Sequence, residues 1–265
     1  MKAIILAAGE GKRLRPLTND IPKCLVNLFG KSLLERQIEI LRKKNIENII
    51  VISGYQKEKI KIKNIKEYHN KDYESTNMLE TLFCAEKEFD ESLIISYGDI
   101  IFEENILESL IESKEEFSVI VDLEWKKYWM IRMEDPTKDV ESLKMNSKGF
   151  ITDIGLPVKD VSEIQGQYIG LMKFQNEALE IIREFYKKCK EEAEKTGVNP
   201  LNPNIPFKKS YITDFIRGLI STGNSIKAIE VKNGWLEVDT FQDYITYEKM
   251  FKNGTISEFF KTDET

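Results

Sequence analysis

The amino-terminal segment constrains the fold of this chain most, because an apolar strand runs directly into a glycine-rich loop. Residues 2–7 form a short apolar run that is typical of a buried strand. Gly9 and Gly11 follow it, and glycines permit a tight turn whose N–H groups face anionic oxygens. Four cations lie in this loop or shortly after it: Lys12, Arg13, Arg15 and Lys23. The segment therefore predicts a binding site for a triphosphate.

Two well-known phosphate loops do not fit these residues. A P-loop needs Gly-Lys followed by Ser or Thr, but Arg13 follows Lys12 here. A dinucleotide-binding fingerprint needs a third glycine at position 14, which is Leu14. A surface turn rich in Lys and Arg is the remaining alternative, and the preceding strand and the two glycines argue against it.

Three later motifs accompany this loop: Ser96 to Asp99, Gln167 to Gly170 and Trp235 to Asp239. Together with residues 6–18 and the pair Pro22 and Lys23, they resemble the signature of the nucleotidyltransferases that join an NTP to a phosphorylated small molecule and release pyrophosphate. The resemblance covers most of the chain and is strongest to the small cytidylyltransferases of the phosphocholine, phosphonate and phosphoglutamine type. It implies a GT-A-like nucleotidyltransferase fold and favours CTP. The commonest family loop has Ser or Thr where this chain has Lys12.

Length and composition limit the classes of protein to consider. The 265 residues, 41% of them hydrophobic, suffice for a single α/β domain over 1–265, with a nucleotide-binding half at 1–115 and an acceptor-binding half at 116–265. A net charge of −6 argues against a nucleic-acid partner or a membrane surface. No apolar run suits a signal peptide or a membrane span, and three dispersed cysteines favour neither zinc nor disulfides. We therefore expect a cytoplasmic protein without membrane insertion.

The hydrophobic pattern predicts an α/β fold with a Rossmann-like, mixed and mainly parallel sheet flanked by helices. Strands are expected at 2–7, 48–53, 93–97, 117–123, 128–133, 150–154, 167–174, 226–231 and 235–238. Helices are expected at 33–44, 76–89, 104–113, 176–195, 211–220 and 241–251, the first opened by a capping box of Ser32 and Glu35. The segment 57–71 is so polar that its periodicity does not distinguish helix from strand. The proline-containing loop 197–210 predicts either a lid or a subunit interface, and the interface would make a homodimer.

Asp99 and Asp239 are predicted to hold the divalent metal that this chemistry requires. Attack of a phosphate on an NTP brings two anions together, so the site must neutralise charge and align the reactants. Both aspartates follow apolar strands, and the resemblance implies that they meet across the site. Mg²⁺ suits carboxylate and phosphate oxygens. An isolated aspartate at such a position is more often a turn residue or a helix cap, but the joint occurrence of both aspartates with the glycine-rich loop favours metal binding.

Lys23 and Arg13 are the predicted catalytic cations, and Asp99 is the predicted catalytic carboxylate. We expect the Lys23 ammonium to bridge the α-phosphate and the leaving pyrophosphate, because a compact ammonium can follow moving charge. The planar guanidinium of Arg13 should grip the β- and γ-phosphates. Lys12 is a weaker candidate, and Arg15 fits an exposed face equally well.

Recognition of the base and ribose is expected from backbone and from short polar side chains. The predicted contacts are Leu6, Ala7, Ala8 and Gly98, the turn of Gly54 and Tyr55, and the triplet Ser75, Thr76 and Asn77. The triplet fits helix capping equally well.

The acceptor site is predicted in the second half of the chain. The run 125–129, which includes Lys126, is either a phosphate clamp with cation–π contacts or a hydrophobic corner whose lysines point to water. By the resemblance, Lys144 is the first candidate for the acceptor phosphate, with Glu141 near it. Gln167, Tyr168 and Gly170 stand where sugar-using relatives carry a Glu-x-Gly pattern. The glutamine in place of the carboxylate weakens the case for a sugar.

These inferences predict a Mg²⁺-dependent enzyme that transfers CMP from CTP to the phosphate or phosphonate of a small molecule of the phosphocholine, aminoethylphosphonate or phosphoglutamine type. Such products serve as precursors of cell-surface polysaccharides or lipids. The alternative is a sugar-1-phosphate nucleotidyltransferase using UTP, dTTP or GTP. A glycosyltransferase would show Asp-x-Asp at Asp99, which two isoleucines follow. A non-catalytic nucleotide-binding relative would have lost Lys23, Asp99 or Asp239.

Overall fold

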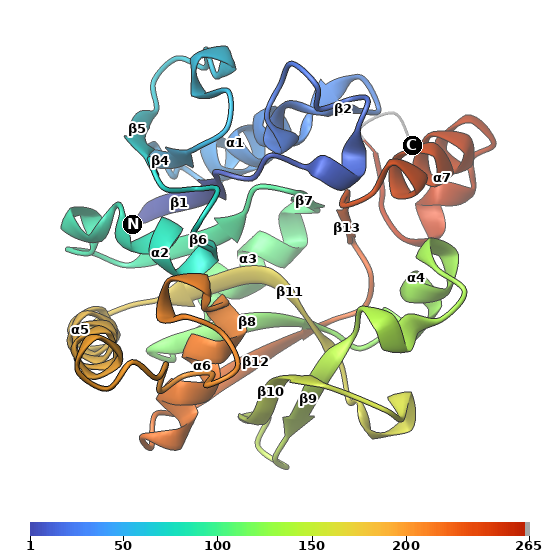
Figure 1. The fold of residues 1–265 in the computed structure, drawn as a ribbon. Coiled ribbons are helices and arrows are strands. Elements are labelled where there is room, and N and C mark those ends of the chain that lie inside the picture. Colours follow the sequence, from blue (N-terminus) through green and yellow to red (C-terminus); the bar gives the residue numbers. More distant parts are fainter. Residues whose placement is uncertain (263–265) are drawn as a thin grey trace.

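A seven-stranded sheet runs through the centre of the molecule in the computed structural model, which describes residues 1–262 (Figure 1). Its strand order is β12-β8-β11-β6-β1-β4-β5. These strands are β1 (Lys2–Ala7), β4 (Asn48–Ser53), β5 (Lys66–His69), β6 (Leu93–Tyr97), β8 (Phe117–Asp122), β11 (Gln167–Phe174) and β12 (Ile226–Val231). Within the described chain, β11 is antiparallel to both neighbours and the other pairs of this sheet are parallel. The expected mixed, mainly parallel sheet is therefore confirmed.

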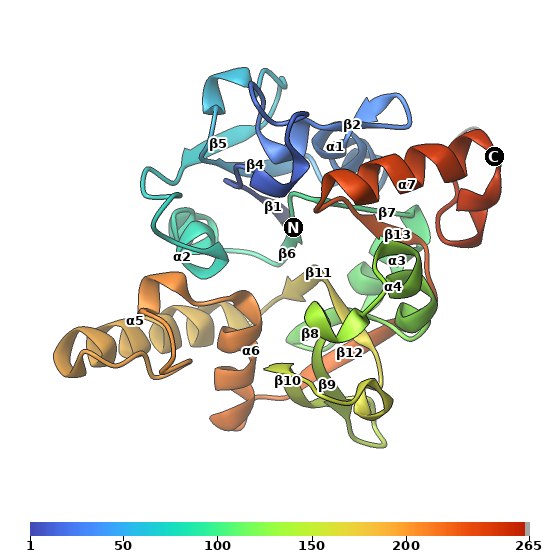
Figure 2. The same ribbon diagram turned by 45° about the vertical axis from the view of Figure 1, so that its right-hand side comes forward.

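Helices flank the sheet on both faces, and short strand pairs lie at its rim. The α-helices are α1 (Leu33–Lys43), α2 (Met78–Phe83), α3 (Glu104–Glu112), α4 (Trp125–Arg132), α5 (Ala178–Thr196), α6 (Ile212–Ser221) and α7 (Phe241–Lys252). The short pairs join β2 (Asn27–Leu28) to β3 (Lys31–Ser32), β7 (Ile100–Phe102) to β13 (Trp235–Glu237), and β9 (Glu141–Met145) to β10 (Ile151–Pro157). Figure 2 shows α5 and α6 together on one side, with α1 and α7 on the other. No helix in residues 1–262 has the length and apolar character to cross a membrane.

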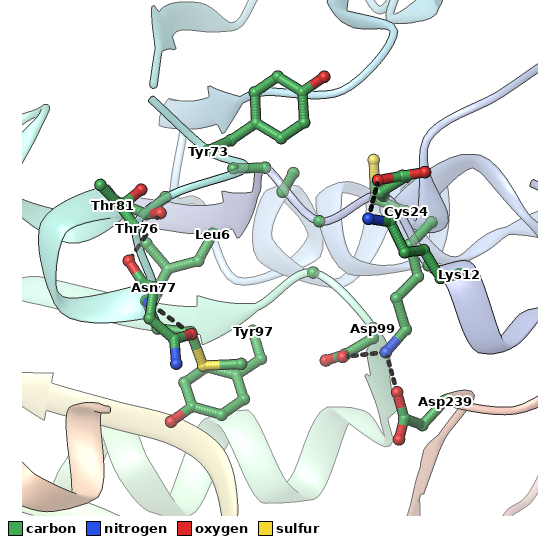
Figure 3. A pocket seen from close by; sticks show the side chains of 18 of the residues that line it. Leu6, Lys12, Cys24, Tyr73, Thr76, Asn77, Thr81, Tyr97, Asp99 and Asp239 are labelled. Atoms are coloured by element: carbon green, nitrogen blue, oxygen red, sulfur yellow. Dashed lines mark hydrogen bonds and ion pairs between the residues drawn. The ribbon is translucent and has the colours of Figure 1, made fainter. Parts of the chain in front are cut away.

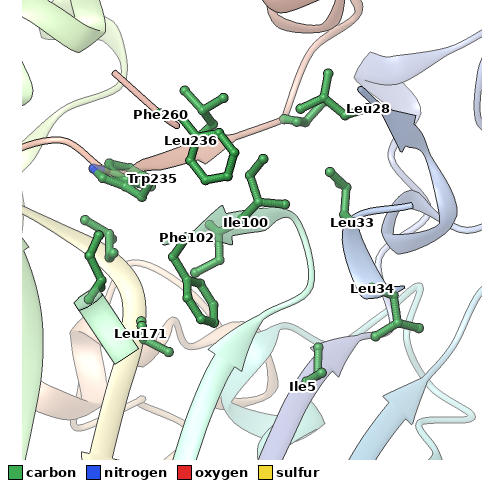
Figure 4. Packing of buried hydrophobic residues seen from close by; sticks show 14 of the residues in the cluster. Ile5, Leu28, Leu33, Leu34, Ile100, Phe102, Leu171, Trp235, Leu236 and Phe260 are labelled. Carbon is green, nitrogen blue, oxygen red and sulfur yellow. The ribbon is translucent and has the colours of Figure 1, made fainter. Parts of the chain in front are cut away.

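Alternation along β1 explains why the sheet has a hydrophobic cluster on each face. Ala3, Ile5 and Ala7 face the cluster that includes buried side chains of α1 and α3, part of which is drawn in Figure 4. Ile4 and Leu6 point the other way, into the cluster that includes α2, α5 and α6. Successive strand residues face opposite sides, so a strand covered on both faces is apolar throughout. The continuous apolar run of β1 follows from its central position.

Residues 128–133 lie mainly in a helix, so the strand predicted there is wrong. Trp125, Tyr128 and Trp129 are all buried on one side of α4, at the i, i+3, i+4 spacing of a helical face. Aromatic residues are frequent in strands, which explains the error. The Tyr128 and Trp235 rings pack with their centroids 5.0 Å apart, so a contact with a distant strand stabilises the helix.

Local capping signals were more reliable than the limits of helices. The predicted capping box is present in α1, because Glu35 N donates to Ser32 Oγ at 3.2 Å and Ser32 N donates to Glu35 Oε2 at 3.0 Å. Of the three candidate caps for α2, Asn77 holds the position. That helix ends at Phe83 rather than near residue 89, and a short 3-10 turn follows it. The short strands β5, β7 and β9 were not anticipated.

Candidate active site

The loops after β1, β4 and β6 emerge at one edge of the sheet because these strands are parallel and in register. Leu6 pairs with Tyr97, and Ala7 pairs with Ser53. In open α/β sheets, ligands bind beyond the carboxyl ends of the strands. A cavity of about 350 Å³ opens at this edge, and we call it the loop cavity (Figure 3).

Most residues that the sequence assigned to a nucleotide line the loop cavity. They are Leu6, Ala7, Ala8, Gly9, Gly11, Lys12, Arg13, Lys23, Thr76, Asn77 and Gly98, and Asp99 and Asp239 join them. Gly54, Tyr55 and Ser75 are not among its lining residues in the described chain. Gly54 instead lets two strand ends approach, since a Cβ there would lie 2.5 Å from the Ala8 carbonyl oxygen. The Tyr55 hydroxyl donates to the Asn19 carbonyl at 2.8 Å. Tyr55 therefore stabilises the segment that follows the glycine-rich loop without lining the cavity.

The glycine-rich loop turns sharply at Gly11. This residue has φ +70°, which glycine adopts without strain. Its carbonyl accepts hydrogen bonds from Leu14 N at 2.9 Å and from Thr18 Oγ1 at 2.7 Å. A Cβ at position 11 would lie 3.1 Å from Lys23 Cβ. Glycine therefore allows the loop to pass close to Lys23.

Lys23 lies at the centre of the charged end of the loop cavity. Its Nζ is 2.6 Å from Asp99 Oδ2 and 2.6 Å from Asp239 Oδ1, and its side chain is only 12% exposed. Burial alone would lower the pKa of Lys23, but the charges of Asp99 and Asp239 raise it. Burial would likewise raise the pKa of Asp239, and Lys23 lowers it. Lys23 and Asp239 are therefore both held in charged form.

The other cations of the loop are much more exposed than Lys23. Arg13 pairs with Asp239 although its side chain is 66% exposed. Lys12 Nζ lies 3.2 Å from Glu10 Oε2, and Arg15 Nη2 lies 2.5 Å from Glu10 Oε1. Exposed pairs of this kind contribute little to stability and are readily exchanged. Lys12 and Arg13, which line the loop cavity, can therefore turn toward an incoming polyanion at small cost, whereas Arg15 is not among the described lining residues.

The two aspartates supply a donor set that fits a divalent metal. Asp99 Oδ1 is buried and has no hydrogen-bond partner within the described structure. A buried oxygen of this kind is costly unless a ligand satisfies it. Residues 1–262 contain no group of three or more His, Cys, Asp or Glu side chains placed to hold a metal by themselves. The pair therefore fits a divalent metal that takes its remaining ligands from water and phosphate oxygens.

The opposite end of the loop cavity is mainly polar and aromatic. Figure 3 shows Tyr73, Thr76, Asn77 and Thr81 on this side, away from Asp99. The sequence did not identify all of the lining residues. Those it missed are Glu10, Cys24, Tyr73, Glu74, Met78, Thr81 and Tyr97. Most are direct neighbours of predicted residues, so adjacency was the available signal.

A second cavity of about 150 Å³ shares Met78 and Tyr97 with the loop cavity, and we call it the aromatic hollow. Its other lining residues are Trp129, Asp139, Glu141, Gln167, Tyr168, Ile169, Gly170, Tyr211, Thr213, Trp235 and Glu237. The sequence had assigned four of these to an acceptor: Glu141, Gln167, Tyr168 and Gly170. Among the described lining residues, three are carboxylates and none is Lys or Arg. Such a surface suits a cation that carries apolar substituents.

Lys126 and Lys144 do not line the aromatic hollow, so the structure does not bring them together with the other residues predicted to bind the acceptor. Lys126 is on the exposed side of α4, while the aromatic side chains of the run 125–129 are buried. That run is therefore a hydrophobic corner whose lysines face water. Lys144 Nζ lies 2.9 Å from Glu163 Oε2 beside a different cavity. Glu141 and Lys144 are three residues apart on β9, so their side chains leave opposite faces.

Arg132 is a buried residue that the sequence did not identify, and it joins the aromatic hollow to the aspartate cluster. Its Nη1 lies 2.7 Å from Glu237 Oε2, and its Nε lies 3.3 Å from Asp243 Oδ1. Asp243 in turn accepts a hydrogen bond from Asp239 N at 3.1 Å. Burial raises the pKa of Glu237, and the charge of Arg132 opposes this. Arg132 thus holds Glu237 and the backbone of Asp239 in a common network.

Comparison with known proteins points to one group of enzymes. The nucleotidyl transferase family profile matches residues 2–128. The chain is 37% identical to the CTP:phosphoglutamine cytidylyltransferase of Campylobacter jejuni over 255 residues, which cover 92% of this chain and 97% of that protein. It is 30% identical to the choline-phosphate cytidylyltransferase of Streptococcus pneumoniae over 261 residues, which cover 96% and 99% of the two chains.

Solved structures show the same fold. The CTP:phosphocholine cytidylyltransferase from Streptococcus pneumoniae superimposes with a TM-score of 0.71 at 24% identity, covering 94% of this chain and 98% of that one. A putative glucose-1-phosphate thymidylyltransferase from Bacillus anthracis has a TM-score of 0.68 at 17% identity, covering 94% of each chain. At 24% and 17% sequence identity, these superpositions show a shared fold.

Proposed function

Because this chain belongs to the nucleotidyl transferase family, we propose that it transfers a cytidylyl group from CTP to the phosphate or phosphonate of a small molecule and releases pyrophosphate. The observation that carries the proposal is the buried contact of Lys23 with Asp99 and Asp239 at the end of the glycine-rich loop. This cluster joins a cation that can follow phosphate charge to carboxylates that can hold a metal. The two relatives at 37% and 30% identity, matched over 92% and 96% of this chain, are named as cytidylyltransferases, which supports CTP.

The main task of the site is to offset repulsion between two anions. The acceptor phosphate has a second pKa of about 6 and is largely dianionic at neutral pH, so it needs no general base. The phosphate groups of CTP would lie along the glycine-rich loop, within reach of Arg13 and Lys12. Lys23 would then exchange an aspartate contact for the oxygens between the α-phosphate and the leaving pyrophosphate. Its raised pKa keeps it cationic during this exchange.

We assign Mg²⁺ to Asp99 and Asp239. Bound there, the metal would supply positive charge to the phosphate oxygens and help to align them. The unsatisfied Asp99 Oδ1 supports this assignment. Arg132 and Asp243 would hold Asp239 in place from behind through the hydrogen bond to its backbone N.

The aromatic hollow is the proposed acceptor site, and its chemistry favours an acceptor that carries a positively charged nitrogen. Three carboxylates and five aromatic side chains line it, and no cation is present among the described lining residues. Carboxylates attract an ammonium, and aromatic faces bind methylated or primary ammonium groups. Choline phosphate and phosphoglutamine, named in the two relatives, each carry such a nitrogen. A sugar offers only hydroxyl groups.

The proposal assigns the halves of the chain different roles. Residues 1–115 contribute most of the loop cavity, and residues 116–265 contribute most of the aromatic hollow. The three cysteines are free thiols, which supports a reducing compartment such as the cytoplasm. We place the reaction in the synthesis of cell-surface polysaccharide or lipid precursors.

Pyrophosphate release tests the proposed function directly. The four NTPs and dTTP would each be combined with Mg²⁺ and with phosphocholine, phosphoethanolamine, 2-aminoethylphosphonate, phosphoglutamine, glucose 1-phosphate or glycerol 3-phosphate. We expect release with CTP and one or more of the nitrogen-bearing acceptors. Release with UTP, dTTP or GTP and the sugar phosphate, but not with CTP, would support a sugar-1-phosphate nucleotidyltransferase instead.

A further inference from the structure

The segment 207–213 bridges the loop cavity and the aromatic hollow, and we call it the bridging segment. It closes the proline-containing loop that the sequence interpreted as a lid or an interface. Its first part contacts the turn that lines the loop cavity, and its last part, at Tyr211 and Thr213, lines the aromatic hollow. It is therefore a physical connection between the two proposed substrate sites.

The contacts with the loop cavity involve main-chain atoms on both sides. Asn77 N donates to the Lys208 carbonyl at 2.9 Å, and Asn77 Nδ2 donates to the Lys209 carbonyl at 3.3 Å. Lys209 Nζ donates to the carbonyl oxygens of Glu74 at 3.1 Å and Thr76 at 3.4 Å. Glu74, Thr76 and Asn77 all line the loop cavity. The ammonium of Lys209 thus ties the bridging segment to the turn expected to contact the base.

The remainder of the bridging segment is held firmly from the other side. Ser210 is fully buried, and its hydroxyl accepts a hydrogen bond from Asn199 Nδ2 at 2.9 Å. Asp214 accepts from Tyr211 N at 2.9 Å and from Arg217 Nη2 at 2.9 Å. Satisfied buried polar networks are stiff. Displacement or ordering at Lys209 is therefore passed on to Tyr211 rather than absorbed between them.

We propose that Lys209 is a positioning residue that couples the two cavities, so that CTP bound in the loop cavity orders the bridging segment and prepares the wall of the aromatic hollow for the acceptor. This inference rests on the proposed use of CTP. Coupling of this kind is reciprocal, so an acceptor in the hollow would strengthen CTP binding by the same factor. The substrates would then bind with positive cooperativity.

Hydrogen–deuterium exchange with CTP and Mg²⁺, in the absence of any acceptor, tests the coupling. In the wild-type protein we expect slower exchange in peptides covering 7–13 and also in peptides covering 207–214, the latter by about fivefold, the lower range of measured couplings. Lys209→Met keeps the aliphatic stem and removes the donors. It should leave protection at 7–13 and reduce that at 207–214 to less than about half.

Lys208→Met is the matched control, because Lys208 is exposed and contributes only its carbonyl to the contact. It should behave as the wild type, and Lys209→Arg should restore most of the protection. Wild-type protection at 7–13 without protection at 207–214 would overturn the coupling while leaving the proposed nucleotide site intact. Absence of protection at 7–13 would instead contradict CTP binding itself. If Lys209→Met changes exchange throughout the unliganded protein, the coupling is judged only from the wild-type protein, by comparing its exchange at 207–214 with and without CTP.

Discussion

The loop cavity and the aromatic hollow share a wall at Met78 and Tyr97, but among the described lining residues only those of the loop cavity include Lys or Arg beside carboxylates. The loop cavity gathers Lys12, Arg13 and Lys23, and the described lining of the hollow contains carboxylates and no Lys or Arg. The difference indicates how one site can accept two phosphorylated substrates. Repulsion between the phosphates is offset from the nucleotide side, whereas the acceptor is recognised by its other, positively charged end.

The two cavities also differ in how their charged groups are stabilised. Lys23 is buried and paired with two aspartates, so its charge is already compensated before a substrate binds. Buried charges without partners cost several kcal/mol each. In the hollow, Glu141 is partly buried, and burial raises its pKa. A cationic ligand would relieve that cost, and this gives the acceptor a physical reason to bind there.

The largest effect is expected from Lys23→Ala, which removes the central cation of the loop cavity. Turnover should fall by about 10²–10³-fold, because the charge that develops on the leaving pyrophosphate loses its partner. Asp99 and Asp239 also lose a buried partner, so the free energy of unfolding should fall by about 3–5 kcal/mol. Pyrophosphate release at saturating substrates and urea denaturation measure the two effects. Arg15→Ala, on the same loop, is the control and should have little effect on either. Near-normal turnover in Lys23→Ala would remove Lys23 from the mechanism.

Asp99→Asn should reduce Mg²⁺-dependent turnover by about 10²-fold, since a neutral amide is a weaker ligand for a hard cation. The Mg²⁺ concentration for half-maximal activity should rise as well, and EDTA should abolish the activity of the wild type. Mg²⁺ titration of turnover provides the measurement. Asp160→Asn changes an exposed carboxylate that is not among the described lining residues of either cavity and serves as control. An unchanged Mg²⁺ titration in Asp99→Asn would contradict metal binding at this residue.

Glu141→Gln tests the role of the aromatic hollow, because it removes one of the carboxylates that line it. We expect the KM for a nitrogen-bearing acceptor to rise about tenfold, or about 1.4 kcal/mol, because one carboxylate facing the ammonium is lost. The KM for CTP should stay unchanged, since Glu141 does not line the loop cavity in the described structure. Steady-state kinetics with each substrate varied separately would show this split. Glu163→Gln, which removes a carboxylate beside Lys144, is the matched control. An equal rise in both KM values would contradict the separation of roles.

The smallest effect on activity is expected from Glu88→Gln, at the edge of the sheet away from both cavities. Hydrogen bonds from Lys66 and Tyr68, together with Lys2, lower the pKa of Glu88 to about 2. Because this folded pKa lies below the unfolded value of about 4.3, Glu88 stabilises the protein fully above pH 4.3, and the contribution is lost as the pH falls toward 2. The substitution should therefore cost about 1–2 kcal/mol at pH 7 and almost nothing near pH 2. Denaturation at several pH values measures it, and a changed KM for either substrate would show that this edge is coupled to the cavities.

Most of the residues that line the loop cavity could be predicted because their signals are local. A glycine-rich turn that follows an apolar strand and is followed by cations can be recognised from residues close together in the sequence. The capping box of Ser32 and Glu35 is a signal of the same local kind. The hollow was harder to predict. Lys126 was chosen as a cation among aromatic residues and Lys144 by the family resemblance, but the helical turn of α4 and the alternation along β9 place both outside the lining of the hollow.

The sequence alone determined the kinds of residue available to the site: a strand, a turn with cations, and carboxylates that follow apolar strands. Only the tertiary structure decided which of them meet. Lys23 lies 76 residues from Asp99 and 216 residues from Asp239, and the structure holds its Nζ at 2.6 Å from both. Such contacts depend on parallel strand register and on the packing of β13 beside β7, which are properties of the whole sheet. Propensities act over a few residues, whereas burial and charge pairing act between segments that meet only after the chain has folded.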